Sequence, residues 1–341
     1  MAEKQREKKG VGEKHFRKII NSFSKIKVLI IGDFISDVYI FGKPFKLSRE
    51  APVVVVRHER EIIVPGGAGN AANNLASLDC KTCALGILGN DFWGDAIVKQ
   101  LSEKNVNVHG LVRSHIVNTT SKTRIMAGDD NTSKQQVIRI DKRHEDPLPS
   151  RLRTKLHDNF LALAKDMDAI IVSDYGYGVI SPRIINELRE LAKQKIVIVD
   201  SRYQLLRFRG VTAVTPNESE AEKAAKMRMI GDHDVKRAAT FLKKRLNLNA
   251  VLITRGNQGM SLLEDNAKIS HIPIVGSDDI TDVTGAGDTV ATVFTLALAA
   301  GAGFYDSARL ANYAAGIVVM KSGTAVINRK ELLEAVRKNH A

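Results

Sequence analysis

Two glycines and an aspartate near the C-terminal end of the chain have the residue types and spacing to handle a phosphate. Gly285 and Gly287 carry no side chain, so backbone N–H groups can crowd around an anion there. The apolar, alanine-rich run 290–300 predicts a buried helix, and the N-terminus of a helix favours negative charge. Asp288 follows the second glycine directly. A carboxylate at an anion site has a use if it takes a proton from a hydroxyl that attacks a phosphoryl group.

The same stretch, residues 282–290, also fits an ordinary glycine turn with Asp288 in the first turn of a helix. A single Gly-x-Gly is a weak signal. The sequence has no Gly-x-Gly-x-x-Gly after a strand and no Gly-x-x-x-x-Gly-Lys-Ser/Thr loop, so neither a dinucleotide fold nor a P-loop is indicated. The case for phosphoryl transfer therefore depends on the rest of the chain.

Polar residues recur where predicted strands end. Residues 26–31 form a continuous apolar run, typical of a strand buried on both faces of a parallel sheet, and regular alternation of strands and helices follows from residue 150. In a doubly wound sheet the carboxyl ends of the strands share one edge, so these side chains should converge on one cleft. Turn chemistry alone is the alternative for the first of them. They are Asp33, Asp174, Asp200, Asn217 and Thr254, with Asp37 just beyond the first.

A glycine-rich stretch, residues 65–70, opens a helix that is predicted to run to about residue 78. Gly66 and Gly67 let the backbone approach a ligand, and Asn70 and Asn74 have amides that can bond hydroxyls. A tight turn followed by a helix cap explains the same residues equally well. On either side of this region, residues 38–64 and 119–140 lack helical patterns and predict a small antiparallel β insertion, or lid.

Composition indicates a globular chain with a basic leader. The 341 residues are 44% hydrophobic and carry a net charge of +13, of which residues 1–27 hold nine Lys and Arg against three Glu. The leader is expected to be a mobile tail, although 11–24 can form an amphipathic helix with Phe16, Ile19, Ile20 and Phe23 on one stripe. Aromatic residues do not interleave with the basic ones, so a nucleic-acid surface is not indicated. No apolar run is long enough to span a membrane, and a cytoplasmic location is expected.

Cys80 and Cys83 form one Cys-x-x-Cys pair. A structural zinc site needs four ligands, and the sequence offers no second pair. We interpret both residues as ordinary reduced cysteines at a helix–strand junction.

Taken in order, four segments resemble the motifs of ribokinase-like (PfkB) carbohydrate kinases: 32–33, 66–70, 217–220 and 282–289. The resemblance covers about residues 26–335. It implies an α/β fold, a doubly wound sheet with helices on both faces and a small β lid. The expected organisation is a basic extension at 1–25 and a kinase domain at 26–338, with lid insertions at about 38–64 and 119–140.

Within that family, segments 32–39, 50–53, 172–175 and 254–263 resemble the heptose kinases of ADP-heptose synthesis. That resemblance implies phosphorylation of D-glycero-β-D-manno-heptose 7-phosphate at O1, with ATP and Mg²⁺, on the route to the lipopolysaccharide core. The chain departs from those kinases at Val38, Arg49 and 201–203. The alternatives are a PfkB-family kinase acting on another sugar, sugar phosphate or nucleoside, and a non-catalytic sugar-sensing protein.

The resemblance also implies roles for individual residues. Asp288 is the implied base, and the backbone of Gly285, Ala286 and Gly287 the anion hole. Asp33, Asp37, Gly66, Gly67, Asn70, Arg124 and Asp174 are implied to bind the sugar substrate. Asn217, Glu218, Ser219, Glu220, Thr254, Gly256, Gly259 and Asn312 are implied to bind ATP, with Glu220 reaching Mg²⁺ through water. A homodimer through the lid is implied as well.

Basic residues in and near the lid are the candidates for binding a phosphate on the acceptor, although each also fits a solvated charged face. They are Lys46, Arg49, Lys122, Arg124, Arg139 and Arg202.

Overall fold

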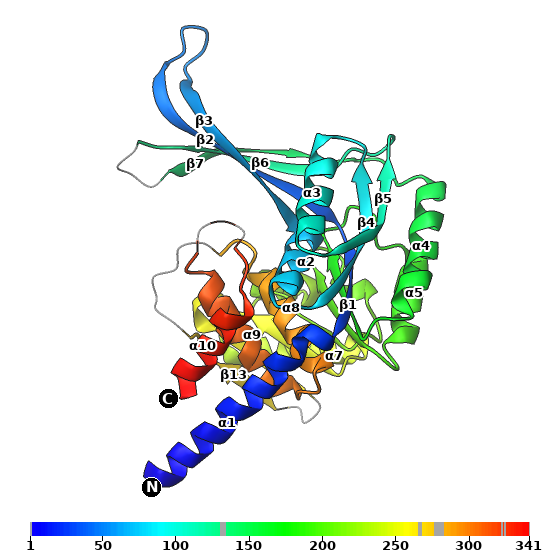
Figure 1. The fold of residues 1–341 in the computed structure, drawn as a ribbon, viewed down its shortest axis with the longest axis vertical. Coiled ribbons are helices and arrows are strands. Elements are labelled where there is room, and N and C mark those ends of the chain that lie inside the picture. The colour runs from blue at the N-terminus through cyan, green and yellow to red at the C-terminus, as the bar shows by residue number, and fades with distance from the viewer. Residues whose placement is uncertain are drawn as a thin grey trace.

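The computed structural model describes residues 2–129, 134–264, 268–275, 283–321, 323 and 325–340. Its main body is a nine-stranded sheet, and a separate four-stranded sheet projects from one end (Figure 1). The predicted α/β architecture with a small β lid is therefore confirmed. Among the described residues, no helix combines the length and the apolar character that crossing a bilayer requires.

The main sheet has the strand order β13-β12-β11-β10-β9-β8-β1-β4-β5. Strands β5 to β11 in this order pair in parallel, while β12 and β13 add an antiparallel edge. Strands β5 and β13 are not predicted from the sequence, because the first contains a glycine and polar residues and the second is a short edge strand. The bounds are β1 Lys27–Gly32, β4 Lys81–Gly89, β5 Asn107–Ser114, β8 Ala169–Asp174, β9 Ile196–Ser201, β10 Ala213–Val214, β11 Ala250–Thr254, β12 Met260–Leu263 and β13 Ile269–Ile272.

Alternating residues of each central strand face two separate hydrophobic cores. Val28 and Ile30 of β1 pack into one core, and Leu29 and Ile31 pack into the other. This explains why the strand is apolar without interruption, since both of its faces are covered by helices. The first core lies under α1 Ala2–Ser22, α2 Ala68–Ser77, α3 Phe92–Glu103, α8 Ala286–Ala299, α9 Phe304–Val318 and α10 Arg329–His340. The second lies under α4 Ser150–Ala164, α5 Pro182–Leu191, α6 Glu218–Ala225 and α7 Asp232–Leu246.

The lid is a four-stranded sheet with the order β3-β2-β6-β7. Its bounds are β2 Phe34–Leu47, β3 Val54–Gly67, β6 Thr120–Ala127 and β7 Gln135–Lys142. The prediction of short antiparallel segments is wrong in two respects. Strands β2 and β3 form one long hairpin, because bulges at 41–42 and 44–46 let the pairing continue, and β2 pairs with β6 in parallel. Residues 130–133 of the predicted lid lie outside the described residues.

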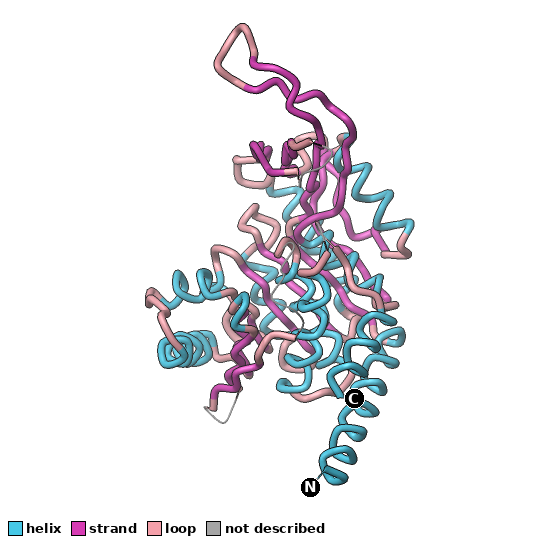
Figure 2. Tube along the Cα trace, turned by 90° about the vertical axis from the view of Figure 1, so that its left-hand side faces the viewer, coloured by secondary structure: helices cyan, strands magenta, loops and turns pink. Residues whose placement is uncertain are grey.

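Helix α1 extends from the body at the end opposite the lid hairpin (Figure 2). The predicted apolar stripe is buried in the first core: Phe16, Ile19 and Ile20 lie on α1, and Phe23 begins the short 3-10 helix that follows it. The second half of the basic extension is thus packed against the same core as the kinase domain, while the boundary at residue 25 stays a prediction. Cys80 and Cys83 are free thiols, and burial raises the pKa of both, that of Cys80 to about 12.

We expect Phe23→Ala to lower the free energy of unfolding by about 3–5 kcal/mol, because it removes a fully buried aromatic ring and leaves a cavity. Urea unfolding followed by circular dichroism measures this. Phe92→Ala is the matched control: that ring is 66% exposed, and its loss should change stability by no more than about 0.5 kcal/mol. Equal effects of the two substitutions would mean that the segment directly after α1 does not contribute to the folded core.

Candidate active site

A cavity of about 610 Å³ lies between the lid and the carboxyl edge of the main sheet. Strands β2, β6 and β7 of the lid, the ends of β8, β9 and β11, and the start of α8 all contribute to it. This is the edge at which the sequence predicts polar side chains to converge. The predicted site residues that line the cavity are Asp37, Gly67, Arg124, Asp174, Asn217, Glu220, Thr254, Gly256, Gly259, Gly285, Ala286, Gly287, Asp288 and Asn312.

Asp288 lies in the first turn of α8 and is almost fully buried. The side-chain Nδ2 of Asn70 donates a hydrogen bond to its Oδ2 at 2.8 Å. Burial, and then the charge of Asp37, raises the pKa of Asp288 from its ordinary 3.8 to about 7, against the lowering effects of Asn70, Lys122 and Arg202. The carboxyl can therefore gain or lose a proton near neutral pH, as a general base must.

The turn before Asp288 has the geometry of an anion site, with one correction. Gly285 is the N-cap of α8 and has φ of 82°, a conformation that favours glycine. The first intrahelical bond runs from the Thr289 N–H to the Gly285 carbonyl, so the preceding N–H groups have no acceptor within the helix. The Ala286 N–H, however, donates to the Val283 carbonyl at 3.2 Å and is less suited to an anion than predicted. Asp282 lies outside the described residues.

Gly287 keeps the cavity open. A Cβ built on it would meet only one atom within 4 Å, Oδ2 of Asp200 at 3.9 Å. A side chain at this position would therefore project between the helix N-terminus and Asp200, into the space that a phosphate would occupy.

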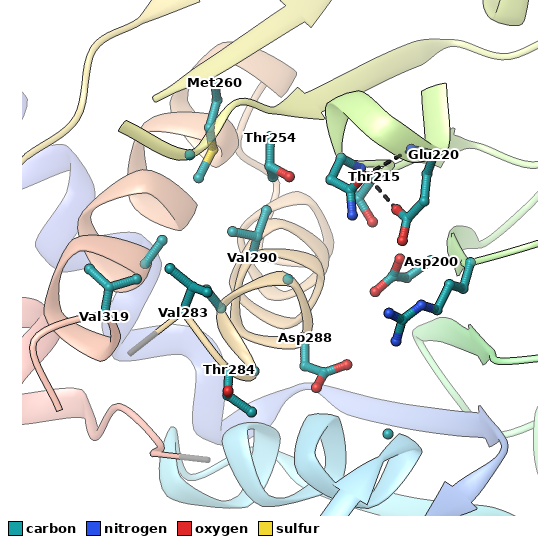
Figure 3. Close-up of a pocket in the computed structure, with 18 of the residues that line it drawn as sticks. Asp200, Thr215, Glu220, Thr254, Met260, Val283, Thr284, Asp288, Val290 and Val319 are labelled. Atoms are coloured by element: carbon teal, nitrogen blue, oxygen red, sulfur yellow. Dashed lines mark hydrogen bonds between the residues drawn. The ribbon is translucent and has the colours of Figure 1, made fainter. Parts of the chain in front are cut away.

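Two carboxylates, Asp200 and Glu220, occupy one side of the cavity (Figure 3). Glu220 belongs to a capping box: its Oε2 accepts from the Asn217 N–H, and Asn217 Oδ1 accepts from the Glu220 N–H, both at 2.9 Å. Burial raises the pKa of both acids, and the charge of Glu220 raises that of Asp200 further. No group of three or more potential ligands suited to a metal occurs among the described residues. A cation here would need water or ligand oxygens to complete its coordination.

The lid side of the cavity is basic. Lys122 on β6 lies 4.8 Å from the ring centroid of Tyr175, and the Arg202 guanidinium lies 5.9 Å from it. Arg124 also lines the cavity, but its Nη1 donates to Asp37 Oδ1 at 2.6 Å, so the Asp37 carboxylate already offsets its charge. Arg139 is half-exposed and paired with Asp141. Lys46 and Arg49, also candidates for binding phosphate, lie toward the lid tip and do not line the cavity.

Two predicted sugar contacts support the cavity from outside its lining. Asp33 Oδ2 accepts from the backbone N–H groups of Tyr175 at 2.8 Å and Tyr177 at 3.2 Å, so it braces the turn after β8. Burial, and then Asp174, raises the pKa of Asp33 to about 7. Gly66 lies against Asp37: a Cβ on it would come within 1.9 Å of Asp37 Oδ2, so only glycine fits.

Three further predicted residues also lie outside the lining. Asn70 is bonded to Asp288 instead of facing the open cavity. Glu218 accepts from Arg255 Nε at 3.0 Å, which ties its carboxylate to the buried arginine after β11. Ser219 lies with Glu218 in the first turn of α6, outside the cavity lining. The placement of Glu218 and Ser219 thus argues against direct contact with ATP, because the helix turns them away.

The opposite end of the cavity is apolar, which the sequence does not reveal. Single apolar residues in helices and strands look like ordinary core. Gly316 gives a faint signal, since a Cβ there would lie 2.1 Å from the Val275 carbonyl. Asn312 lines this end, and its Nδ2 donates to the Pro273 carbonyl at 2.6 Å. Figure 3 shows Met260, Val283, Val290 and Val319 away from Asp200 and Glu220. The apolar residues of the lining also include Ile274, Val275 and Ala315.

The raised pKa of Asp288 predicts a pH-dependent stability. Between about pH 4 and 7 the folded chain holds a proton on Asp288 that the unfolded chain has released, so wild-type stability falls as pH rises through this window. Asp288→Asn removes this group. Its stability relative to wild type should rise by about 1.4 kcal/mol per pH unit in that window. Urea titrations at pH 5, 6 and 7 measure it, and a difference that does not vary with pH would contradict the assignment.

Comparison with known proteins identifies the family. A family model described as pfkB family carbohydrate kinase matches residues 25–331. The bifunctional protein HldE of Geobacter sulfurreducens is 38% identical over 92% of this chain and 64% of its own length. HldE of Geotalea uraniireducens is 36% identical over 96% of the chain and 66% of its own length. HldE of Helicobacter pylori is 34% identical over 92% of the chain and 67% of its own length. The chain therefore spans about two thirds of the length of these curated relatives.

Solved structures show the same fold at low identity. Arabidopsis thaliana ribokinase, complexed with ribose and ATP, superposes with a TM-score of 0.70 at 18% identity, over 92% of this chain and 98% of its own. Escherichia coli phosphofructokinase-2, in complex with substrates and products, gives a TM-score of 0.73 at 18% identity, over 92% and 99%. The chain thus belongs to the pfkB family of carbohydrate kinases and is a phosphotransferase that acts on a sugar hydroxyl.

Proposed function

We propose that this chain is an ATP-dependent kinase that phosphorylates D-glycero-β-D-manno-heptose 7-phosphate at O1. The product would be the 1,7-bisphosphate used for ADP-heptose and lipopolysaccharide core synthesis. The observation that carries the proposal is one cavity with anion-attracting groups on both sides of Asp288: the turn at Gly285–Gly287 and the pair Lys122 and Arg202. The resemblance of segments 32–39, 50–53, 172–175 and 254–263 to heptose kinases supports the choice of sugar.

Asp288 is proposed as the general base. It takes the proton from the O1 hydroxyl as that oxygen attacks the terminal phosphoryl group of ATP. Its pKa of about 7 suits this task at neutral pH, since an ionised fraction is present and the carboxylate is basic enough to hold the proton. Asn70, bonded to Oδ2, fixes the carboxylate.

The donor end of the cavity is proposed to hold ATP. The apolar side chains around Val290 and Val319 suit a flat base, and the N–H groups at the start of α8 suit its terminal phosphates. Asn217, Thr254, Gly256 and Gly259 line the wall between these two parts. Glu218 and Ser219 do not contribute, because they lie in the first turn of α6, outside the cavity lining.

Mg²⁺ fits beside Asp200 and Glu220. Their oxygen atoms are ligands that this cation prefers. Burial raises the pKa of both acids, and the charge of Glu220 raises that of Asp200 further, so a bound cation would stabilise the ionised carboxylates. Because no group of three or more potential metal ligands occurs among the described residues, water and phosphate oxygens would complete the coordination. When bound, the cation would neutralise charge on the phosphates.

The lid side is proposed to bind the acceptor. Asp37, Gly67 and Asp174 face the sugar hydroxyls, and Lys122 and Arg202 face its phosphate. The lid covers this side of the cavity, which would keep water from competing with the sugar as the acceptor.

Asp288→Asn should lower turnover by roughly 10²–10⁴, the usual contribution of a positioned base, and leave ATP binding intact. Coupled ADP-release kinetics and calorimetric titration with Mg·ATP measure the two properties. Asp306→Asn, at the same position in the first turn of α9, is the matched control and should keep full activity. Near-wild-type turnover in Asp288→Asn would rule out this residue as the base.

The kinase should prefer an acceptor that already carries a phosphate. Each charged hydrogen bond contributes about 1.5–3 kcal/mol, so two of them favour heptose 7-phosphate over free heptose by roughly 10²–10⁴ in kcat/KM. Lys122→Met should lower kcat/KM for the phosphorylated sugar about 10- to 100-fold and change that for the free sugar far less.

The assay is ADP release with Mg·ATP over a panel of heptose 7-phosphate, free heptose, fructose 6-phosphate, ribose and adenosine. Lys99→Met is the control, because that side chain is exposed on α3, away from the cavity. Equal activity on the phosphorylated and free sugars would move the assignment to a free-sugar kinase. Activity confined to another compound would name another acceptor, and no turnover on the panel would favour a sugar-sensing protein.

We also propose a homodimer that forms through the lid. The lid exposes large apolar side chains to solvent on the β2–β3 hairpin and on β7, and burying them in an interface is favourable. Light scattering at micromolar concentration should give about twice the chain mass of 37.4 kDa. Leu47→Glu combined with Val54→Glu should give monomers, whereas Phe92→Glu should not; a monomeric wild type would contradict the proposal. The exposed side chains are Phe45, Leu47, Val53, Val54, Val137, Ile138 and Ile140.

The remaining expectations stay predictions: a cytoplasmic location, no nucleic-acid partner and no membrane partner.

A further inference from the structure

A chain of buried side-chain hydrogen bonds joins α2 to α8 and ends on Asp288. Asn70 Nδ2 donates to Asp288 Oδ2 at 2.8 Å. Asn74, one turn further along α2, donates through its Nδ2 to the Asn70 carbonyl at 3.0 Å, and lies 3.5 Å from Asn70 Oδ1. Thr289 Oγ1 lies 3.2 Å from Asn74 Oδ1 and equally far from the Gly285 carbonyl. All of these side chains are buried.

The donor and acceptor pattern fixes the orientation of both amides. Only the Nδ2 end of Asn70 can donate to the carboxylate, which turns its Oδ1 toward Asn74. If the Asn74 amide were flipped, its Oδ1 would face the backbone carbonyl oxygen of Asn70. Two acceptors would then lie about 3.0 Å apart with no proton between them. The Thr289 hydroxyl, as a donor to Asn74 Oδ1, favours the observed orientation.

Burial makes this arrangement consequential. Asn70 and Asn74 lie on a helix whose neighbours Ala71, Ala72 and Leu75 belong to the first hydrophobic core. Hydrogen bonds in such surroundings are stronger than in water, and a lost partner is costly to replace. These hydrogen bonds also reach the glycine turn before Asp288, because the Thr289 hydroxyl approaches the backbone carbonyl of Gly285, the N-cap of α8.

We propose that Asn74 and Thr289 are positioning residues for Asp288, acting through the Asn70 amide. They hold that amide so that it donates to Oδ2, which leaves Oδ1 to take the proton from the acceptor hydroxyl. The inference rests on the proposed role of Asp288 as the base. The sequence suggests that the amides of Asn70 and Asn74 bond hydroxyls of the sugar. The geometry gives both a task on the base instead, and adds Thr289 to them.

The proposal has a measurable consequence with a definite sign. The Asn70 donor stabilises the ionised carboxylate and lowers the pKa of Asp288. A variant that loosens this amide therefore raises that pKa, and the acid limb of the kcat/KM profile moves to higher pH. Damage to the fold alone would instead lower activity at every pH.

The test uses Asn74→Ala and Thr289→Val, with Thr289→Ser as the variant that keeps the hydroxyl. Asn73→Ala is the matched control, because Asn73 is a buried asparagine on the same helix with no bond into this chain of contacts. The pKa of Asp288 is measured by ¹³C NMR of aspartate carboxyl groups, assigned with Asp288→Asn, and the pH profile of kcat/KM is measured alongside.

We expect Asn74→Ala and Thr289→Val to raise the pKa of Asp288 by about half a unit to one unit. A full unit would lower kcat/KM about fivefold at pH 7, with recovery above about pH 9. Thr289→Ser and Asn73→Ala should leave both measurements unchanged. If Asn74→Ala fails to fold, Thr289→Val alone can test the proposal, since it removes one hydroxyl and keeps the shape of the side chain.

An unshifted carboxyl resonance in both test variants would overturn the proposal, as would a loss of activity that does not depend on pH. The NMR titration does not require turnover, so it separates this inference from the proposed function. Full activity in Asp288→Asn would refute the role of the base, whereas an active base with unchanged titration in Asn74→Ala and Thr289→Val would refute only the positioning residues.

Discussion

The site depends on the burial of a carboxylate, Asp288, at the start of a helix that is otherwise apolar. Taking a charge out of water is costly, and here the nearby charge of Asp37 adds to that cost. The structure offsets it with the amide of Asn70 and with the charges of Lys122 and Arg202. The balance leaves the pKa of the carboxyl at about 7, where proton transfer is easiest at physiological pH. Burial also raises the pKa of Asp200 and Glu220, across the cavity from Asp288.

Helix α8 can hold a buried carboxyl in its first turn because the rest of the helix is tightly packed. Residues 288–298 are all buried, and they pack against α2, α9 and the strands β8 and β9. A helix held on every side cannot shift its first turn to relieve an unfavourable charge, so the anion turn and the base keep a fixed relation to each other. The nine-stranded sheet then brings the polar ends of β8, β9 and β11 to the same edge.

Most of the fold and the polar part of the site follow from the sequence, because they depend on short-range patterns. Continuous apolar strands such as β1 predict burial on both faces, and parallel strands predict convergence of Asp174, Asp200 and Thr254. Sequence reasoning misses the contacts between residues that are far apart along the chain. The side chains of residues 70 and 288, which are hydrogen-bonded, are separated by 218 positions, and Lys122 and Arg202, also far apart along the chain, both lie near the ring of Tyr175. The apolar end of the cavity is missed because its residues have the same pattern as a core.

The lid and the hydrogen bond to Asp288 are joined by one continuous segment of chain. Strand β3 of the lid ends at Gly67, and α2 begins at the next residue and carries Asn70 to Asp288. Gly67 has φ of 56°, and Gly66 lies against Asp37, so the junction is tightly specified on both sides. Asp37 in turn accepts a hydrogen bond from Arg124 and offsets its charge, so Lys122 and Arg202 are the cations that we propose for phosphate binding. The lid strand β3 therefore leads directly into the helix whose Asn70 is hydrogen-bonded to Asp288.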